Sequence, residues 1–143
     1  MQLVIEGQRL VKDVQAEFTK AYPFLKLEFF KNGTVREKKH PFQKQVPVTE
    51  KLGNVAALKK SEGILDIQEK MTVANIENEF MHQFGLTVEV FRRSGNVWLE
   101  TTMTDNWTLK QQNEHGEEIT MGKKVSSVYG NNNDYELNRD ADH

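Results

Sequence analysis

The 143-residue sequence contains no cysteine and no long apolar run. The absence of cysteine excludes disulfide bonds and cysteine-ligated metal sites, and it favours a reducing compartment. No stretch approaches the roughly 20 apolar residues that a membrane-spanning helix needs. The first ten residues, "MQLVIEGQRL", include Glu6 and lack the apolar core of a signal peptide. The sequence therefore predicts a soluble, cytoplasmic protein that does not contact a membrane.

Motifs for catalysis and cofactor binding are also missing. The sequence has no P-loop, no glycine fingerprint for a dinucleotide and no Gly-x-Ser-x-Gly elbow. Its four histidines stand in unrelated contexts, and His115 with the neighbouring glutamates matches no standard metal spacing. We therefore expect no catalytic residues, no cofactor and no metal. A non-catalytic role is favoured over an enzyme of unrecognised type.

One pattern occurs twice in the sequence. Residues 3–33, "LVIEGQRLVKDVQAEFTKAYPFLKLEFFKNG", match residues 65–95, "LDIQEKMTVANIENEFMHQFGLTVEVFRRSG", with a shift of 62 positions. In each stretch apolar residues first alternate, as in a half-buried strand, and then recur on one helix face. They alternate again once a residue is dropped after the helix. The matched pairs are Leu3/Leu65, Ile5/Ile67, Val11/Val73, Val14/Ile76, Phe18/Phe80, Tyr22/Phe84, Leu25/Leu86, Leu27/Val88 and Phe29/Val90.

Each stretch predicts a strand–helix–strand unit. Thr72 is a suitable N-cap and Gly85 a suitable terminator for the second helix, while Pro23 ends the first. Two such units pack most simply as a ferredoxin-like (split βαβ) two-layer α+β sandwich, with both helices on one face of a mainly antiparallel sheet. A further hairpin strand, "NVWLETT", would extend the unit to βαββ. A chance match between two amphipathic helices is the alternative to an internal duplication.

The rest of the chain is less regular. We expect a single domain over residues 1–121, with a long connection over residues 36–62 and a short helix over about residues 106–115, which Gly116 ends. The connection is basic, because residues 34–62 carry seven Lys/Arg against three Glu. The polar residues 122–143 are predicted to be a disordered tail. The net charge of −2 gives no global attraction to nucleic acid or an anionic membrane.

The candidate binding surface is the sheet face turned away from the two helices. Alternation along the strands turns Phe30 and Phe91 outward, and Trp98 joins them if its neighbours face inward. Basic residues lie beside these rings in the sequence. Aromatic rings on an open sheet face indicate an interaction site. The predicted binding residues are Phe30, Lys31, Phe91, Arg92, Arg93 and Trp98.

Three interpretations of this surface remain open. The segment with Trp107 and Leu109 can fold across the face and cover it. The face can bind an unknown protein partner or a second copy of the chain, since aromatic residues and arginine anchor such interfaces. It can also stack single-stranded nucleic acid, with the basic connection contacting phosphates. We expect a non-catalytic binding or adaptor domain for a protein partner, with nucleic-acid binding as the alternative.

Overall fold

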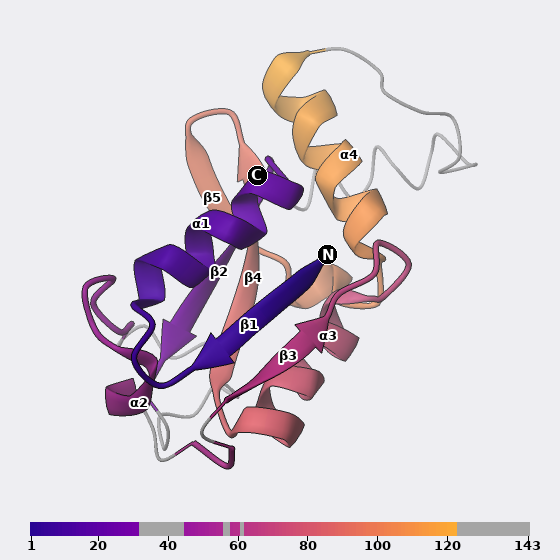
Figure 1. The fold of residues 1–143 in the computed structure, drawn as a ribbon. Coiled ribbons are helices and arrows are strands. Elements are labelled where there is room, and N and C mark those ends of the chain that lie inside the picture. The colour runs from indigo at the N-terminus through magenta and orange to yellow at the C-terminus, as the bar shows by residue number, and fades with distance from the viewer. Residues whose placement is uncertain (32–44, 56–57, 61, 123–143) are drawn as a thin grey trace.

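The computed structural model describes residues 1–31, 45–55, 58–60 and 62–122. They form an α+β fold with two antiparallel sheets and four α-helices (Figure 1). None of these helices is long and apolar enough to cross a membrane. In chain order the elements are β1 (Gln2–Glu6), α1 (Val11–Ala21), β2 (Leu25–Phe30), α2 (Leu52–Val55), β3 (Glu62–Asp66), α3 (Val73–Glu79), the π-helical turn η2 (Phe80–Phe84), β4 (Thr87–Ser94), β5 (Val97–Glu100), the 3₁₀ turn η3 (Thr102–Thr104) and α4 (Leu109–Met121).

The strands form two sheets instead of the single sheet expected from the sequence. β1 pairs with β3, and β2 pairs with β4, which also pairs with β5, all antiparallel. Each crossover helix therefore carries its second strand into the other sheet. Figure 1 shows the β1–β3 sheet in front of β2 and β4, with α1 and α3 on opposite sides of the strands. A strand shows the same alternation of apolar residues in one sheet or in two, because the alternation depends on which side chains are buried. It does not identify the strand with which it pairs.

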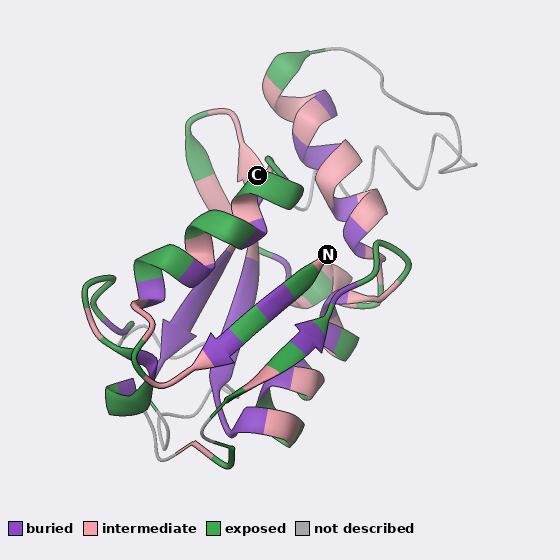
Figure 2. Ribbon diagram, in the orientation of Figure 1, coloured by how far each residue is buried: buried purple, intermediate pink, exposed green. Residues whose placement is uncertain are grey.

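The core lies between the two sheets and the helices. β1 buries Leu3 and Ile5 and exposes Val4, and this alternation is visible along β1 in Figure 2. β2 is buried on both faces for most of its length. All the apolar residues of the nine matched pairs are buried in one core, which also includes Val46, Leu52, Val55 and Leu109.

Equivalent residues of the two stretches face one another in both sheets. Leu3 is directly opposite Leu65 in the β1–β3 pair. Glu28 is directly opposite Glu89 in the β2–β4 pair. An antiparallel pair centred on equivalent residues is what a two-fold axis between two similar units produces.

The correspondence continues beyond the matched stretches. The Leu52 backbone N–H donates to the Arg9 carbonyl at 2.9 Å, and the Leu109 N–H donates to the Met71 carbonyl at the same distance. Arg9 and Met71 are 62 positions apart, as in the sequence match. Two isolated antiparallel bridges, Leu10–Lys51 and Thr72–Thr108, also start from residues 62 positions apart, Leu10 and Thr72. Each half of the chain thus returns to its own crossover helix and begins another helix there, α2 or α4.

The helix ends agree with the sequence for α3 and differ for α4. The Thr72 hydroxyl caps α3 by accepting from the Asn75 N–H, and Gly85 follows η2 with a left-handed φ of 73°. α4 begins after Thr108 and continues through Gly116 to Met121, so the predicted helix over about residues 106–115 was too short. Gly116 has a packing role instead, since a Cβ there would lie 2.9 Å from the Phe24 side chain. The predicted tail, apart from Gly122, and much of the basic connection lie outside the described residues.

We predict that Leu27→Ala lowers the free energy of unfolding by about 2–5 kcal/mol, because it opens a cavity between the two sheets. Val4→Ala serves as the control, since Val4 is 44% exposed on the outer face of β1, and it is expected to cost less than about 1 kcal/mol. Urea unfolding monitored by circular dichroism measures both values. Similar losses for the two variants would contradict a core between the sheets.

Stability is also predicted to fall in alkali because of Tyr22. Burial, and then the nearby Glu69 carboxylate, raise the pKa of the Tyr22 phenol above its ordinary value of 10.0. Above pH 10 the folded state therefore holds this proton while the unfolded state releases it, so stability falls as the pH rises. Urea unfolding of the wild type and Tyr22→Phe between pH 8 and pH 11 tests this. The wild type should lose more stability over this range, and equal losses would contradict the prediction.

Candidate functional site

The outer face of the β2–β4–β5 sheet carries most of the residues predicted to bind a partner. Strand register and alternation together decide which side chains share this face. Lys26 is opposite Phe91, and Arg93 is opposite Trp98, so these four side chains lie on it. The complete set for this face is Lys26, Glu28, Phe30, Thr87, Glu89, Phe91, Arg93, Trp98 and Glu100.

The structure does not bring Phe30 and Phe91 together. Phe30 is opposite Thr87, whereas Phe91 is opposite Lys26, four residues along the same strand. At about 3.3 Å per residue, this separates the two rings by roughly 13 Å along the sheet. Phe30 is also only 5% exposed, while Lys31, which follows it, is exposed. The expected single patch is therefore divided, with Phe30 and Lys31 at one end of β2 and Phe91, Arg93 and Trp98 at the other.

Arg92 lies on the opposite face of the sheet and is 1% exposed. It is opposite Leu99 in β5, and α4 packs over it. Its Nη1 donates to Gln112 Oε1 at 2.9 Å, and its guanidinium carbon lies 6.0 Å from the centre of the Trp107 ring. Arg92 therefore belongs to the packing of α4 and not to the outer face.

Trp107 and α4 do not pack on the outer face. The Trp107 ring contacts His115 edge-on, with ring centres 5.4 Å apart, and Leu109 lies in the core. α4 packs on β4 from the side of Arg92, where Gly116 approaches the Arg92 side chain. The segment with Trp107 and Leu109 was one of the three interpretations for covering the outer face, but it packs on the opposite face of the sheet.

Lys26 joins the aromatic and acidic side chains of the outer face. Its Nζ lies 2.8 Å from Glu28 Oε2, 5.0 Å from the centre of the Trp98 ring and 5.8 Å from that of Phe91. An ammonium group at such distances is attracted to the face of an aromatic ring. On β4, Arg93 donates from Nε to the Gly95 carbonyl at 2.9 Å. The cluster therefore holds two rings and two cations in fixed positions.

A groove of about 290 Å³, here called the Trp98 groove, lies beside this cluster. One wall is a stripe of α1 residues spaced i, i+3, i+4 and i+7, and the floor comes from β2 and β5. Two hydrogen bonds hold α1 against the edge of β2, from Gln15 Nε2 to the Leu27 carbonyl at 2.7 Å and from Thr19 Oγ1 to the Leu25 carbonyl at 2.9 Å. The lining residues are Lys12, Gln15, Ala16, Thr19, Lys26, Glu28, Val48 and Trp98.

The groove combines one aromatic ring with two lysines. Lys26 is paired with Glu28, whereas Lys12 is exposed on α1. Such a surface suits a ligand with an apolar or aromatic group next to an anionic group. Within the described residues, no group of three or more His, Asp or Glu side chains could hold a metal ion.

Sequence reasoning missed two features of this region. The polar stripe of α1 carried no prediction, but it forms the groove wall because Gln15 and Thr19 bond to the edge of β2. His115 and Gln112, both in α4, are fully buried. The spacing of Leu109, Gln112 and Gly116 follows a helix face, yet a face with so few apolar side chains gives a weak hydrophobic signal.

Comparison with known proteins adds no assignment. No protein-family model, curated protein or solved structure matches this chain.

The different positions of Arg92 and Arg93 lead to a stability prediction. Arg92→Ala is expected to destabilise the fold by about 2–4 kcal/mol, because it removes a buried hydrogen bond and leaves a cavity under α4. Arg93→Ala, on the half-exposed outer face, is expected to cost less than about 1 kcal/mol. Urea unfolding of the two variants distinguishes these roles. Equal destabilisation by both would contradict the burial of Arg92 alone.

Proposed function

We propose that this chain is a non-catalytic binding domain that takes up a short segment of a partner protein in the Trp98 groove. The observation that supports this most directly is the Lys26 ammonium group held between Glu28 and the Trp98 and Phe91 rings, at the wall of that groove. Tryptophan, flanked by positive charge and a partly apolar hollow, is a typical anchor of a protein interface.

The groove favours a partner segment with an apolar side chain next to a carboxylate. Trp98, Ala16 and Val48 supply apolar contact area. Lys12 and Lys26 attract an anionic group, and Gln15 and Thr19 can bond to a backbone. The groove is small, so it accommodates one or two side chains of the partner and not a folded surface.

Single-stranded nucleic acid is the second candidate ligand. Phe91 and Trp98 provide rings for base stacking, with Lys26 and Arg93 close by. Three carboxylates, those of Glu28, Glu89 and Glu100, lie on the same face and repel a phosphate chain. Protein binding is therefore the better-supported proposal. An enzyme of unrecognised type remains third and would have to use the partly buried Glu28 that lines the groove.

We also infer that the two halves of the chain are copies of one strand–helix–strand unit. The supporting observations are the equivalent residues paired at Leu3–Leu65 and Glu28–Glu89 and the equivalent backbone hydrogen bonds that anchor α2 and α4. A chance likeness of two amphipathic helices does not account for hydrogen bonds outside those helices. Within the described residues, the two halves differ because β5, which carries Trp98, follows only the second unit.

The proposed function is tested with a random peptide library selected for binding to the wild-type protein. We expect selected peptides to carry Asp or Glu next to an aromatic or aliphatic residue. Trp98→Ala is expected to weaken their binding by about tenfold or more, because hot-spot tryptophans contribute at least about 2 kcal/mol. Fluorescence anisotropy of the labelled peptides measures the affinities, and the fluorescence of Trp98 in a Trp107→Phe background reports ligand contact with the groove.

Val97→Ala is the matched control, because Val97 is exposed but lies on the other face of β5. It should bind the selected peptides as the wild type does. Peptides that bind Trp98→Ala equally well would contradict the groove as the site. Binding of an oligothymidylate that falls steeply with salt would instead favour the nucleic-acid candidate.

A further inference from the structure

Within the described residues, the outer edge of β3 presents main-chain groups that have no hydrogen-bond partner. Met1 and Ile67 exchange two hydrogen bonds, from the Met1 amino group to the Ile67 carbonyl at 2.7 Å and from the Ile67 N–H to the Met1 carbonyl at 2.8 Å. Hydrogen-bonded and non-hydrogen-bonded pairs alternate in an antiparallel ladder. The main-chain groups of Glu62, Ile64 and Asp66 therefore point away from β1. Among the described residues, none bonds to them on this side.

The free edges of β2 and β4 are closed by specific bonds. Along β2, the carbonyls of Leu25, Leu27 and Phe29 accept from Thr19, Gln15 and the Val46 N–H. Along β4, beyond the end of β5, the Val90 N–H donates to Glu77 and its carbonyl accepts from Thr101. Edge strands are usually protected in such ways, because exposed N–H and C=O groups recruit further strands. The edge of β3 differs from those of β2 and β4, because its outward main-chain groups bond to no other described residue.

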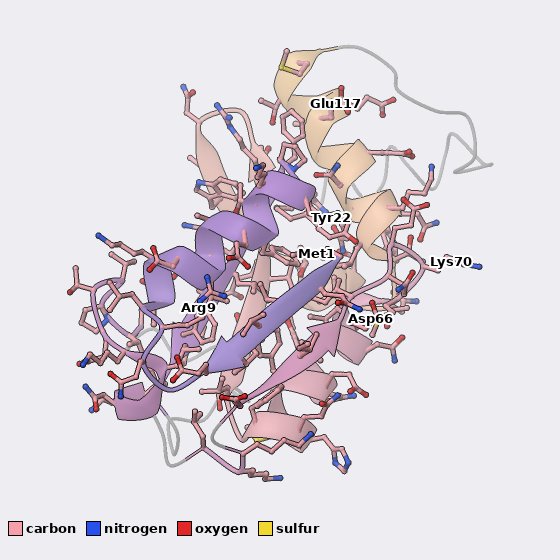
Figure 3. The ribbon with its side chains drawn as sticks, viewed as in Figure 1. Met1, Arg9, Tyr22, Asp66, Lys70 and Glu117 are labelled. Carbon is pink, nitrogen blue, oxygen red and sulfur yellow. The ribbon has the colours of Figure 1, made fainter. Side chains whose placement is uncertain are left out.

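On the equivalent edge of β1, one carbonyl bonds to an arginine that has no counterpart at the edge of β3. Arg9 Nη1 donates to the Val4 carbonyl at 2.8 Å, and an ion pair with Glu17 at 2.7 Å holds the guanidinium there. The residues 62 positions on from Val4 and Arg9 are Asp66 and Met71. The side chain of a methionine has no N–H to donate. Figure 3 shows Arg9 and Asp66 on opposite sides of the β1–β3 sheet.

We propose that the edge of β3 binds an extended segment of a partner protein as a third, antiparallel strand. Charge identifies the segment: Glu62 and Asp66 are exposed on the outer face of β3 and flank Ile64, which is 57% exposed. Side chains of a paired strand stand about 5 Å from those directly opposite. The partner therefore carries Lys or Arg opposite Glu62 and Asp66 and an apolar residue opposite Ile64. The pattern is basic–x–apolar–x–basic.

The same charges disfavour a second copy of this chain as the occupant. An antiparallel pair of two β3 strands centred on Ile64 would place Glu62 of each copy opposite Asp66 of the other. Like charges directly opposite one another destabilise a sheet. This site is separate from the Trp98 groove, which is built on the other sheet, so either proposal can fail without the other.

The test uses a fluorescein-labelled peptide with the sequence Ser-Lys-Thr-Val-Thr-Lys-Ser, acetylated and amidated at its ends. Its binding is measured by fluorescence anisotropy. We expect Ile64→Pro to weaken binding by about tenfold or more, because proline removes the N–H that faces the peptide. Proline is tolerated at an edge position whose N–H does not pair within the sheet. Val4→Pro is the matched control on the opposite edge and should leave binding unchanged.

A second pair of variants keeps the test valid if Ile64→Pro fails to fold. The double variant Glu62→Lys, Asp66→Lys changes only exposed side chains and should also weaken binding by about tenfold or more. It should instead bind the peptide in which both lysines are replaced by glutamate. Trp98→Ala should bind the original peptide as the wild type does.

The peptide backbone gives a direct signature of strand addition. Methylating the valine nitrogen removes a bond to Ile64 and should abolish binding, whereas methylating a threonine nitrogen, which faces away from β3, should preserve it. Exchange of the Ile64 amide hydrogen should slow when the peptide is added. Three outcomes would overturn the proposal. The first is no detectable binding at millimolar peptide, and the second is equal binding of the peptide to Ile64→Pro and to the wild type. The third is slowed exchange of the Ile64 amide hydrogen that depends on protein concentration and not on the peptide.

Discussion

The antiparallel pairing of equivalent strands is the constraint on which the rest of this fold depends. β2 meets β4 at Glu28 and Glu89, and β1 meets β3 at Leu3 and Leu65. Since each crossover helix joins strands of different sheets, this pairing brings the two sheets face to face. The apolar faces of all four strands then meet in one core. A slip of one residue in either pair would turn every core side chain of that strand outward.

This pairing also decides where binding surfaces can form. It places equivalent residues at opposite ends of the sheet, so Phe30 and Phe91 cannot make one patch. Surfaces arise instead where the two halves differ. β5 brings Trp98 to the outer face beside α1, and Met71 stands where Arg9 bonds to the edge of β1 in the other half. Both candidate sites thus depend on departures from the internal symmetry of the described residues.

The sequence predicted what depends on local periodicity and missed what depends on pairing. The stripe from Val11 to Tyr22 predicted α1, and Thr72 and Gly85 predicted the limits of the second helix. No such pattern states that β2 pairs with β4, because the register is set by packing between distant segments. Arg92 shares the face of Leu25 and was grouped with the surface residues for its charge alone. Gly116 was taken as a terminator, although the close approach of Phe24 gives it a role inside a helix.

The buried carboxylates at the centre of the sheet connect stability with the proposed site. Glu28 and Glu89 are directly opposite one another, and each is less than one-tenth exposed. Repulsion between two carboxylates in these positions destabilises the sheet. Lys26 offsets this repulsion by pairing with Glu28, and Gln15 Nε2 adds a contact of 3.4 Å to the same carboxylate. The same two side chains line the Trp98 groove. The interactions that keep Glu28 buried therefore also fix a cation beside Trp98, so a ligand meets a preorganised charge and not a freely moving lysine.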